Sequence, residues 1–317
     1  MAARMMPGAP VAEAVFADLE PRIAALVAAG HRPGLGTILV GGDSASAGYI
    51  RMKMEKAESL GFTSPHIHLP DDATQADVLA AIGQMNDADD VDSVLIQHPT
   101  PPQIDFDAAL LALDPDKDVD GLHPVNMGRL ALGMPGPVPC TPAGIEALLS
   151  HYEIPVSGHE VCILGRGTTL GRPLALLLSQ KRPTANAAVT VVHTGVPNWA
   201  DYTRRAGIVI AAAGVPGILR PEHITPGAVV VGAGGGSVPG AVTMGPAAVV
   251  VVPPGALVPG RSAASSSPTG RSSPPRRLTA TPIAIAATAR TTSPVPIRRR
   301  RRRRSWSSAG SSVTAPS

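Results

Sequence analysis

The segment Gly158-His-Glu-Val-Cys-Ile-Leu-Gly-Arg-Gly-Thr-Thr-Leu-Gly-Arg-Pro173 carries most of the information about the fold. It begins with a short apolar run typical of a buried strand, continues through Gly165, Gly167 and Gly171, and precedes a predicted helix at Leu174–Gln180. This order suits a dinucleotide pyrophosphate, because the backbone comes close to the anion and the helix N-terminus attracts it. The spacing departs by one residue from the usual GxGxxG pattern, and a tight turn without a ligand is the alternative.

The next predicted strand, Ala188–His193, indicates which dinucleotide is bound. A site for NAD usually has Asp or Glu at the end of this strand, where the carboxylate holds the ribose hydroxyls. This chain has His193 and Thr194 there instead, and Arg166 lies inside the glycine turn. A cation and a hydroxyl favour a 2′-phosphate, so we predict NADP. The other predicted strands of this Rossmann-like, doubly wound sheet are Ala206–Ala213 and Ala228–Val231.

The N-terminal half also alternates strands and helices. The predicted strands are Thr37–Val40, His66–Leu69 and Val91–Ile96. The predicted helices are Val11–Ala29, a helix through residues 46–57 that ends at Gly61, Thr74–Met85 and Phe106–Leu113. This alternation predicts a parallel sheet with helices on both faces, which is a three-layer α/β domain. A helix from Thr141, as N-cap, to about His151 is expected to follow.

Tyr49 and Lys53 are four residues apart on the predicted helix, so the phenol and the amine share one face of it. Ser44 or Ser46 is the expected N-cap. A Lys held near apolar residues can lose its proton close to neutral pH and act as a general base or nucleophile. The alternative is a solvated Lys with the Tyr ring along its stem.

Polar side chains also follow the strand Val91–Ile96. Ligands of parallel sheets bind beyond the carboxyl ends of the strands, which places Gln97 near the Lys53 helix, whereas His98 is expected at the surface. An amide that only fixes the proline-rich turn is the alternative for Gln97. The turn at residues 114–121 then holds several carboxylates, but their spacing does not match a calcium loop. One of these carboxylates is expected to accept hydrogen bonds from a pair of N–H donors, such as the amino edge of a pyrimidine ring.

Composition divides the 317 residues into two kinds of polypeptide. Residues 1–232 hold 15 Lys and Arg and all 24 Asp and Glu, a balance of −9, whereas residues 233–317 hold 12 Arg and no acid. We therefore predict domains at residues 1–138 and 139–236 and a disordered low-complexity tail at 237–317. Cys140 and Cys162 lack metal-ligand spacing and are expected to be small buried hydrophobes. No metal, signal peptide or membrane span is predicted, and a cytoplasmic location is expected.

Residues 11 to about 232 resemble the bifunctional methylenetetrahydrofolate dehydrogenase/cyclohydrolase family. The segments that carry the resemblance are, in order, Val40–Ser46 with Tyr49 and Lys53; Gln97–Pro101; Lys117–Gly121 with Asn126 and Gly128; Pro139–Gly144; Gly165–Pro173; and His193. The resemblance implies a folate-binding first domain and an NADP-binding second domain, and a homodimer formed through the second domain. Its implied activity is oxidation of 5,10-methylenetetrahydrofolate by NADP, followed by hydrolysis of the methenyl product to 10-formyltetrahydrofolate.

The resemblance also implies a role for each matching residue. Lys53 is the general base and proton shuttle, Gln97 tunes it, and Tyr49 stacks on or orients the folate. Asp120 binds the amino edge of the pterin. The implied cofactor-binding residues are Gly165, Arg166, Gly167, Gly171, His193, Thr194 and Gly235.

Departures from the family pattern begin in the second domain. Gly167 stands where the family usually has Ser, and Gly207 and Gly232 replace Asp. After Gly232 the family's glycine-rich loop and last helix are not recognisable, and we hypothesise that a frameshift in a GC-rich gene replaced them. An inactive or truncated homologue is therefore one alternative, and another NADP-linked dehydrogenase is a second. The run Arg298–Arg304 would bind polyanions, but no nucleic-acid module precedes it, so nucleic acid is not an expected partner.

Overall fold

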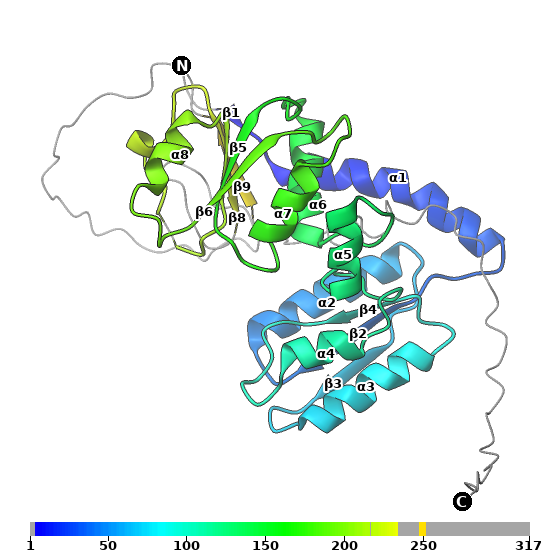
Figure 1. Cartoon of the computed structure of the whole chain (residues 1–317). Coiled ribbons are helices and arrows are strands. Elements are labelled where there is room, and N and C mark those ends of the chain that lie inside the picture. The colour runs from blue at the N-terminus through cyan, green and yellow to red at the C-terminus, as the bar shows by residue number, and fades with distance from the viewer. Residues whose placement is uncertain (1–3, 216, 234–246, 252–317) are drawn as a thin grey trace, which may run out of the picture.

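The computed structural model describes residues 4–215, 217–233 and 247–251, which form two α/β domains (Figure 1). The first domain has a sheet of order β3-β2-β4, and all of its pairings are parallel. Its strands are β2 (Leu35–Val40), β3 (His66–Leu69) and β4 (Ser93–Ile96). Its helices are α1 (Gly8–Ala28), α2 (Ser44–Ser59), α3 (Gln75–Asp87) and α4 (Phe106–Ala112).

Helices cover both faces of this sheet, as predicted. On one face Leu19 of α1 and Ile50 of α2 pack with Leu35. On the other face Ile82 of α3 packs with Ile38, which is completely buried. Each fully buried Leu or Ile side chain contributes about 1.5–3 kcal/mol relative to an exposed one. The three-layer prediction is therefore confirmed.

Two helix starts differ from the prediction. Asp43, and not a serine, caps α2: its carboxylate accepts a hydrogen bond of 2.7 Å from the backbone N–H of Ser46. Ser44 is the first helical residue and Ser46 is buried, so neither occupies the N-cap position. The helix α6 (Cys140–His151) begins directly after its N-cap Pro139, two residues earlier than an N-cap at Thr141 would allow.

The second domain has a sheet of order β1-β9-β8-β7-β5-β6. Its strands are β5 (Glu160–Leu164), β6 (Ala188–Val192), β7 (Ile208–Ala211), β8 (Val229–Ala233), β9 (Ala247–Val251) and β1 (Arg4–Met5). Strands β5 to β8 are parallel, whereas β9 and β1 are antiparallel to their neighbours. Its remaining helices are α7 (Gly171–Leu178), α8 (Trp199–Arg205) and the 3-10 helix η1 (Pro221–His223). Ile163 packs with α6 and α7, and its neighbour Leu164 packs with α8, so this sheet is doubly wound.

The predicted domain boundaries need correction at both ends. Strand β1 belongs to the second sheet, although residues 1–138 were assigned to the first domain, and β9 lies within the segment assigned to the tail. A two-residue strand has no periodicity that a sequence can reveal. The Val-rich run of β9 has strong β propensity, which the composition of the surrounding segment hid. Other residues of the predicted tail lie outside the described residues.

Helices α1 and α5 (Pro124–Leu132) join the two domains (Figure 1). Val11 near the start of α1 packs into the core of the second domain, whereas Leu19 packs into that of the first. The side-chain amide of Gln180 donates to the carbonyl of Leu130 in α5 at 2.9 Å. Among the described residues, no helix has the length and apolar character that crossing a membrane requires.

Candidate active site

Lys53 and Gln97 meet in the structure. The ammonium of Lys53 donates to the side-chain oxygen of Gln97 at 3.3 Å, across 44 positions of sequence. Gln97 is only 9% exposed, and its amide nitrogen donates to the carbonyl of His98 at 2.8 Å. Its backbone N–H pairs with Ile38 of β2, so Gln97 extends the parallel ladder beyond β4. The carboxyl edge of the sheet therefore positions the oxygen that Lys53 faces, as predicted from sequence.

Tyr49 lies one helical turn before Lys53 on α2. Its side chain is among the exposed large residues, at 40%. An exposed aromatic ring can present an apolar face to a planar ligand. His98 is also exposed, as expected, and its ring packs on Phe106 with centroids 4.8 Å apart.

Asp120 completes this cluster. Burial raises the pKa of Asp120 above its ordinary value, and the neighbouring charge of Asp118 acts in the same direction. The charge of Lys53 and a hydrogen bond from the Cys140 thiol oppose this rise. Asp120 therefore lies close enough to Lys53 for the two charges to interact. A partly buried carboxylate next to a Lys is suited to binding the paired N–H donors of a heterocycle.

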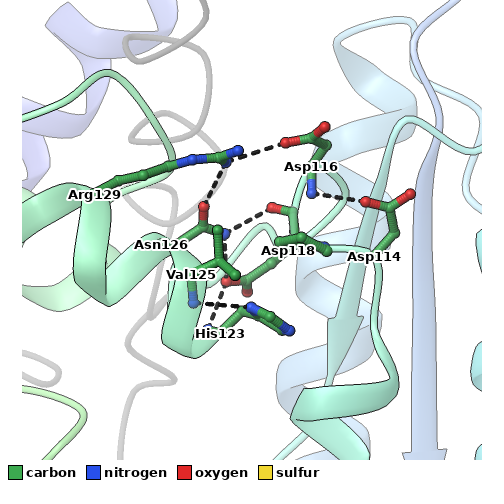
Figure 2. A network of polar contacts seen from close by, with 8 residues as sticks. Asp114, Asp116, Asp118, His123, Val125, Asn126 and Arg129 are labelled. Carbon is green, nitrogen blue, oxygen red and sulfur yellow. Dashed lines mark hydrogen bonds and ion pairs between the residues drawn. The ribbon is translucent and has the colours of Figure 1, made fainter.

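The other carboxylates of the turn have structural partners (Figure 2). Asp118 is 1% exposed, and its Oδ2 accepts from the backbone N–H of His123 at 2.8 Å and from the Asn126 amide at 2.9 Å. Asp116 pairs with Arg129, which also donates to Asn126 (Figure 2). Within the described residues, no group of three or more His, Cys, Asp or Glu is placed to hold a metal. These carboxylates fix the loop that carries Asp120.

Lys117 also has a structural role. Its ammonium donates to the carbonyls of Met85, Asn86 and Ala88 at distances between 2.8 and 3.0 Å. These carbonyls lie at the C-terminal end of α3, where a cation is favoured by the helix dipole. The backbone of Lys117 also accepts from Val94 of β4, so this segment runs beside the strand and delivers Asp120 to its carboxyl end.

The glycines of the turn after β5 allow backbone segments to approach one another closely. Gly165 has a φ of +140°, and a Cβ there would lie 2.2 Å from the backbone oxygen of Ala212. A Cβ at Gly171 would lie 2.2 Å from the carbonyl oxygen of Gly165. Nothing lies within 4 Å of the Cβ position of Gly167, so that position is open. The turn precedes α7, and its backbone can therefore hold a pyrophosphate at the helix N-terminus.

The cationic and hydroxyl residues predicted to select NADP lie at the same sheet edge. Gly165 donates to the carbonyl of Val192 at 2.8 Å, so the glycine turn starts beside the residue that precedes His193. The Nδ1 of His193 accepts from the backbone N–H of Gly195 at 3.1 Å. Arg166 and Thr194 are exposed, and no ion pair engages Arg166 in the part of the chain that the structure describes. Gly235, also predicted to bind the cofactor, lies outside the described residues.

Cys140 is the site residue that sequence reasoning missed. It was expected to be a small buried hydrophobe, but its thiol donates to the carbonyl of Val119 at 3.5 Å, next to Asp120 in the chain, and burial and the charge of Asp120 raise the pKa of this thiol well above its ordinary value. The sequence did contain an indication that Cys140 lies near the site, because Pro139–Gly144 is one of the segments that carry the family resemblance. Cys162, by contrast, is buried in the core of the second domain.

A parallel sheet with a Lys, Gln and Asp cluster, followed by a Rossmann-like sheet with a glycine turn, defines a two-domain, dinucleotide-dependent enzyme. The family model of the tetrahydrofolate dehydrogenase/cyclohydrolase catalytic domain matches residues 6–120. The model of the NAD(P)-binding domain of the same family matches residues 139–252, past the Gly232 at which the sequence departs from the family pattern. The chain belongs to the tetrahydrofolate dehydrogenase/cyclohydrolase family.

Individual proteins agree with the family models. The chain is 64% identical over 232 residues to bifunctional protein FolD 1 of Salinispora tropica, covering 73% of this chain and 76% of that protein. It is 56% identical over 234 residues to bifunctional protein FolD of Syntrophotalea carbinolica, covering 74% of this chain and 81% of that protein.

Solved structures show the same fold. A crystal structure of the bifunctional enzyme FolD, methylenetetrahydrofolate dehydrogenase/cyclohydrolase, from Campylobacter jejuni matches with a TM-score of 0.68 at 36% identity, over 71% of this chain and 79% of that one. The Trypanosoma brucei enzyme, complexed with its NADP cofactor and an inhibitor, matches with a TM-score of 0.68 at 36% identity, over 76% and 84% of the two chains.

Proposed function

We propose that this chain oxidises 5,10-methylenetetrahydrofolate to the 5,10-methenyl form with NADP, and hydrolyses that product to 10-formyltetrahydrofolate. The observation that carries the proposal is the contact of 3.3 Å between the Lys53 ammonium and the Gln97 oxygen, with Asp120 beside them. The membership of the chain in the family supports it further.

Lys53 handles the proton of the hydrolytic step. Addition of water to the methenyl carbon requires a group that takes a proton from the attacking water. In its neutral amine form Lys53 takes this proton and later gives it to the pterin nitrogen that is released when the ring opens, and the Gln97 oxygen orients the Lys53 nitrogen through the hydrogen bond. The oxidation step needs no such base, because hydride transfer depends mainly on the positioning of the two reactants.

Asp120 and Tyr49 orient the folate. The carboxylate of Asp120 accepts from the N–H donors of the pterin's amino edge, and the exposed ring of Tyr49 stacks against the bicyclic ring. Lys53 lies one helical turn beyond Tyr49, so a ring on the tyrosine is also within reach of the base. With Asp120, Tyr49 and Lys53 in these positions, the folate binds in the same orientation for both reactions.

The residues of the glycine turn fit a dinucleotide. Gly165 and Gly171 allow the turn to pack tightly against Ala212 and against itself, which places the turn directly before the N-terminus of α7, where a pyrophosphate binds favourably. Arg166, with His193 and Thr194 at the end of β6, holds the 2′-phosphate. NADP, when bound, supplies the hydride acceptor. The open position at Gly167 lacks the hydroxyl that the family usually has there.

We further infer a cytoplasmic homodimer formed through the second domain. Strand β6 lies at the edge of its sheet, and Val191 on this strand is 39% exposed, which favours pairing with a second copy. The two cysteines are free thiols, in keeping with a reducing compartment. Sedimentation of the purified chain at micromolar concentration tests the dimer, and a monomer at all concentrations contradicts it.

The function is tested with the purified full chain in two assays. Reduction of NADP in the presence of 5,10-methylenetetrahydrofolate measures the dehydrogenase, and loss of the absorbance of 5,10-methenyltetrahydrofolate measures the cyclohydrolase. We expect both activities, with NADP preferred to NAD. The absence of both activities in a folded chain would identify an inactive homologue, whereas oxidation without hydrolysis would favour another kind of NADP-linked dehydrogenase.

The arginine run Arg298–Arg304 lies outside the described residues. We infer no nucleic-acid function for it, because no recognition module precedes it. Retention on DNA that survives deletion of residues 252–317 would contradict this inference.

A further inference from the structure

The loop after α7 carries a side chain that joins the two domains. Gln180 lies two residues beyond the end of α7, the helix that begins at the glycine turn. Its side-chain nitrogen donates to the carbonyl of Leu130 in α5 at 2.9 Å. Leu130 is buried, and its carbonyl is one of the last four of the helix, where donors from outside the helix are favoured. Gln180 therefore contacts the C-terminal end of α5 from the second domain.

Helix α5 itself is fastened to the first domain (Figure 2). The side-chain amide of Asn126, which is completely buried, donates to Oδ2 of Asp118 at 2.9 Å. One turn further along, Arg129 pairs with Asp116 at 3.1 Å. Both contacts tie α5 to the turn that ends in the folate-binding Asp120. Helix α5 is thus held in place relative to the folate site by the first domain alone.

Arg182 fixes the orientation of the Gln180 amide. The Nε–H of Arg182 donates to the side-chain oxygen of Gln180 at 3.0 Å. A guanidinium group can only donate hydrogen bonds, so the amide oxygen must face it, and the amide nitrogen is left for the carbonyl of Leu130. The opposite orientation would place two donors together at Arg182 and two acceptors together at Leu130. Both neighbours therefore select the same direction for the contact between the domains.

Arg182 is in turn held firmly within the second domain. Its Nη2 donates to the carboxylate of Glu146 in α6 at 2.9 Å and to the carbonyl of Leu177 at 3.5 Å. Its Nη1 donates to the same carboxylate and to the hydroxyl of Thr184. With the bond from Nε to Gln180, all five N–H donors of the guanidinium have acceptors. No donor is left over for a ligand, so the arrangement holds Gln180 in place.

We propose that Gln180 is a positioning residue that fixes the dinucleotide helix α7 relative to the folate domain, so that the two reactants meet for hydride transfer. This role rests on the proposed function, but the hydrogen bonds do not. Hydride transfer depends on the alignment of two reactants that different domains bind. Hydrolysis uses Lys53 and Gln97, which both belong to the first domain. Loss of the contact between Gln180 and Leu130 should therefore affect the dehydrogenase and spare the cyclohydrolase.

The substitution Gln180→Glu removes this contact selectively. The carboxylate still accepts from Arg182, but it has no donor for the carbonyl of Leu130. We expect the kcat of the dehydrogenase to fall about 3- to 10-fold, which is the shift in the aligned population that loss of one hydrogen bond produces. The kcat of the cyclohydrolase should stay within about 2-fold of the wild-type value. Gln180→Leu adds no charge and should change the ratio of the two activities in the same direction.

A matched control lies within the first domain. The side-chain nitrogen of Gln75 in α3 donates to the carbonyl of Asp105 at 3.3 Å, and its oxygen accepts from the backbone N–H of Asp105 at 2.8 Å. Gln75→Glu removes the same kind of donor without touching the contact between the domains, so the ratio of the two activities should not change. Equal falls of both activities in Gln180→Glu and Gln180→Leu, or an unaltered dehydrogenase in both, would overturn the proposal.

A distance measurement tests the positioning without any reaction. Spin labels are attached at Leu111→Cys of α4 and Arg205→Cys of α8, two exposed positions in different domains, in a full chain whose two native cysteines are replaced by alanine. Double electron–electron resonance should give a broader or shifted distance distribution in Gln180→Glu and an unchanged one in Gln75→Glu. An unchanged distribution in Gln180→Glu would overturn the proposal. If the wild-type chain shows neither activity, the proposed function fails, and the distances still decide whether Gln180 positions the domains.

Discussion

The ammonium of Lys53 on α2 lies 3.3 Å from the side-chain oxygen of Gln97, which follows β4. The two residues come from different layers of the first domain, and only the parallel pairing of β2 with β4 brings them together. The 9% exposure of Gln97 means that its oxygen faces Lys53 and not bulk water. A Lys held in this way has a defined orientation before a substrate arrives, which lowers the cost of ordering it during the reaction.

Removal of the base should separate hydrolysis from cofactor binding. In Lys53→Ala the cyclohydrolase rate is expected to fall about 100- to 10,000-fold, because the variant lacks the proposed acceptor of the proton of the attacking water. The dissociation constant of NADP, measured by fluorescence titration, should stay within a few-fold of the wild-type value. Unaltered hydrolysis in this variant would remove Lys53 from its role.

The 2′-phosphate assignment predicts a selective effect at Arg166. In Arg166→Ala the affinity for NADP should fall about 10- to 100-fold, the cost of a hydrogen bond between charged groups. The affinity for NAD should change much less, because NAD lacks the 2′-phosphate. Arg22→Ala, which removes an exposed arginine of α1, is the control for loss of charge. Equal losses for the two dinucleotides in Arg166→Ala would refute the assignment.

The glycines of the turn should respond differently to substitution. Gly165→Ala and Gly171→Ala each place a Cβ 2.2 Å from backbone atoms, so the chain must shift, and the free energy of unfolding should fall by at least about 1 kcal/mol.

Gly167→Ser enters open space and supplies the hydroxyl that the family usually has. We expect its affinity for NADP to rise about 2- to 10-fold without loss of stability. Thermal unfolding and NADP titration of the three variants distinguish these effects. A stable Gly171→Ala, or weaker NADP binding in Gly167→Ser, would contradict this account of the turn.

The raised pKa of Asp120 links function to stability. Because burial raises this pKa above its ordinary value of 3.8, the folded state binds the proton more tightly than the unfolded state. The contribution of Asp120 to stability therefore falls as the pH rises from 3.8 through the raised value. Asp120→Asn carries no charge, so it should be more stable than the wild type at neutral pH and lose folate binding.

Thermal unfolding of both proteins as a function of pH checks this prediction. The advantage of Asp120→Asn should grow with pH across that range. Asp114→Asn, at a carboxylate six residues earlier in the same turn, serves as the control. An advantage that does not change with pH would show that the charge of Asp120 is not its cause.

Much of the site could be predicted because its residues follow buried strands. The apolar runs before Gln97 and Gly165 identify the strands, and the carboxyl ends of parallel strands share one edge of a sheet. Lys53 was identifiable from its spacing to Tyr49 and from the family resemblance. The contact of Cys140 with Val119 was not predictable from pattern, since it depends on the approach of Gly121 to Pro139 across a linker.

The missed elements have similar physical reasons. Helix α5 is short, and its N-cap is His123, whose ring nitrogen accepts from the backbone of Val125 at 3.1 Å. Histidine is not among the usual capping residues, although Pro124 at the first helical position and Gly133 after the last one are typical of helix ends. Asp43 was overlooked as the cap of α2 because two serines follow it. In both helices the N-cap is the residue whose side chain accepts a hydrogen bond from the backbone, and the sequence alone does not show which of several neighbouring residues does so.

The pairing of β1 with β9 makes the first domain an insertion within the second. The polypeptide starts in the second sheet, leaves through α1, builds the first domain, and returns through the linker before Cys140. On the ribosome, the first domain can complete its sheet as soon as β4 and the Asp120 loop have emerged. Strand β1 has no pairing partner until β9, the last described strand in the sequence, has been synthesised. The sheet of the first domain can thus form early, whereas the sheet of the second domain gains its antiparallel edge only after β9 has emerged.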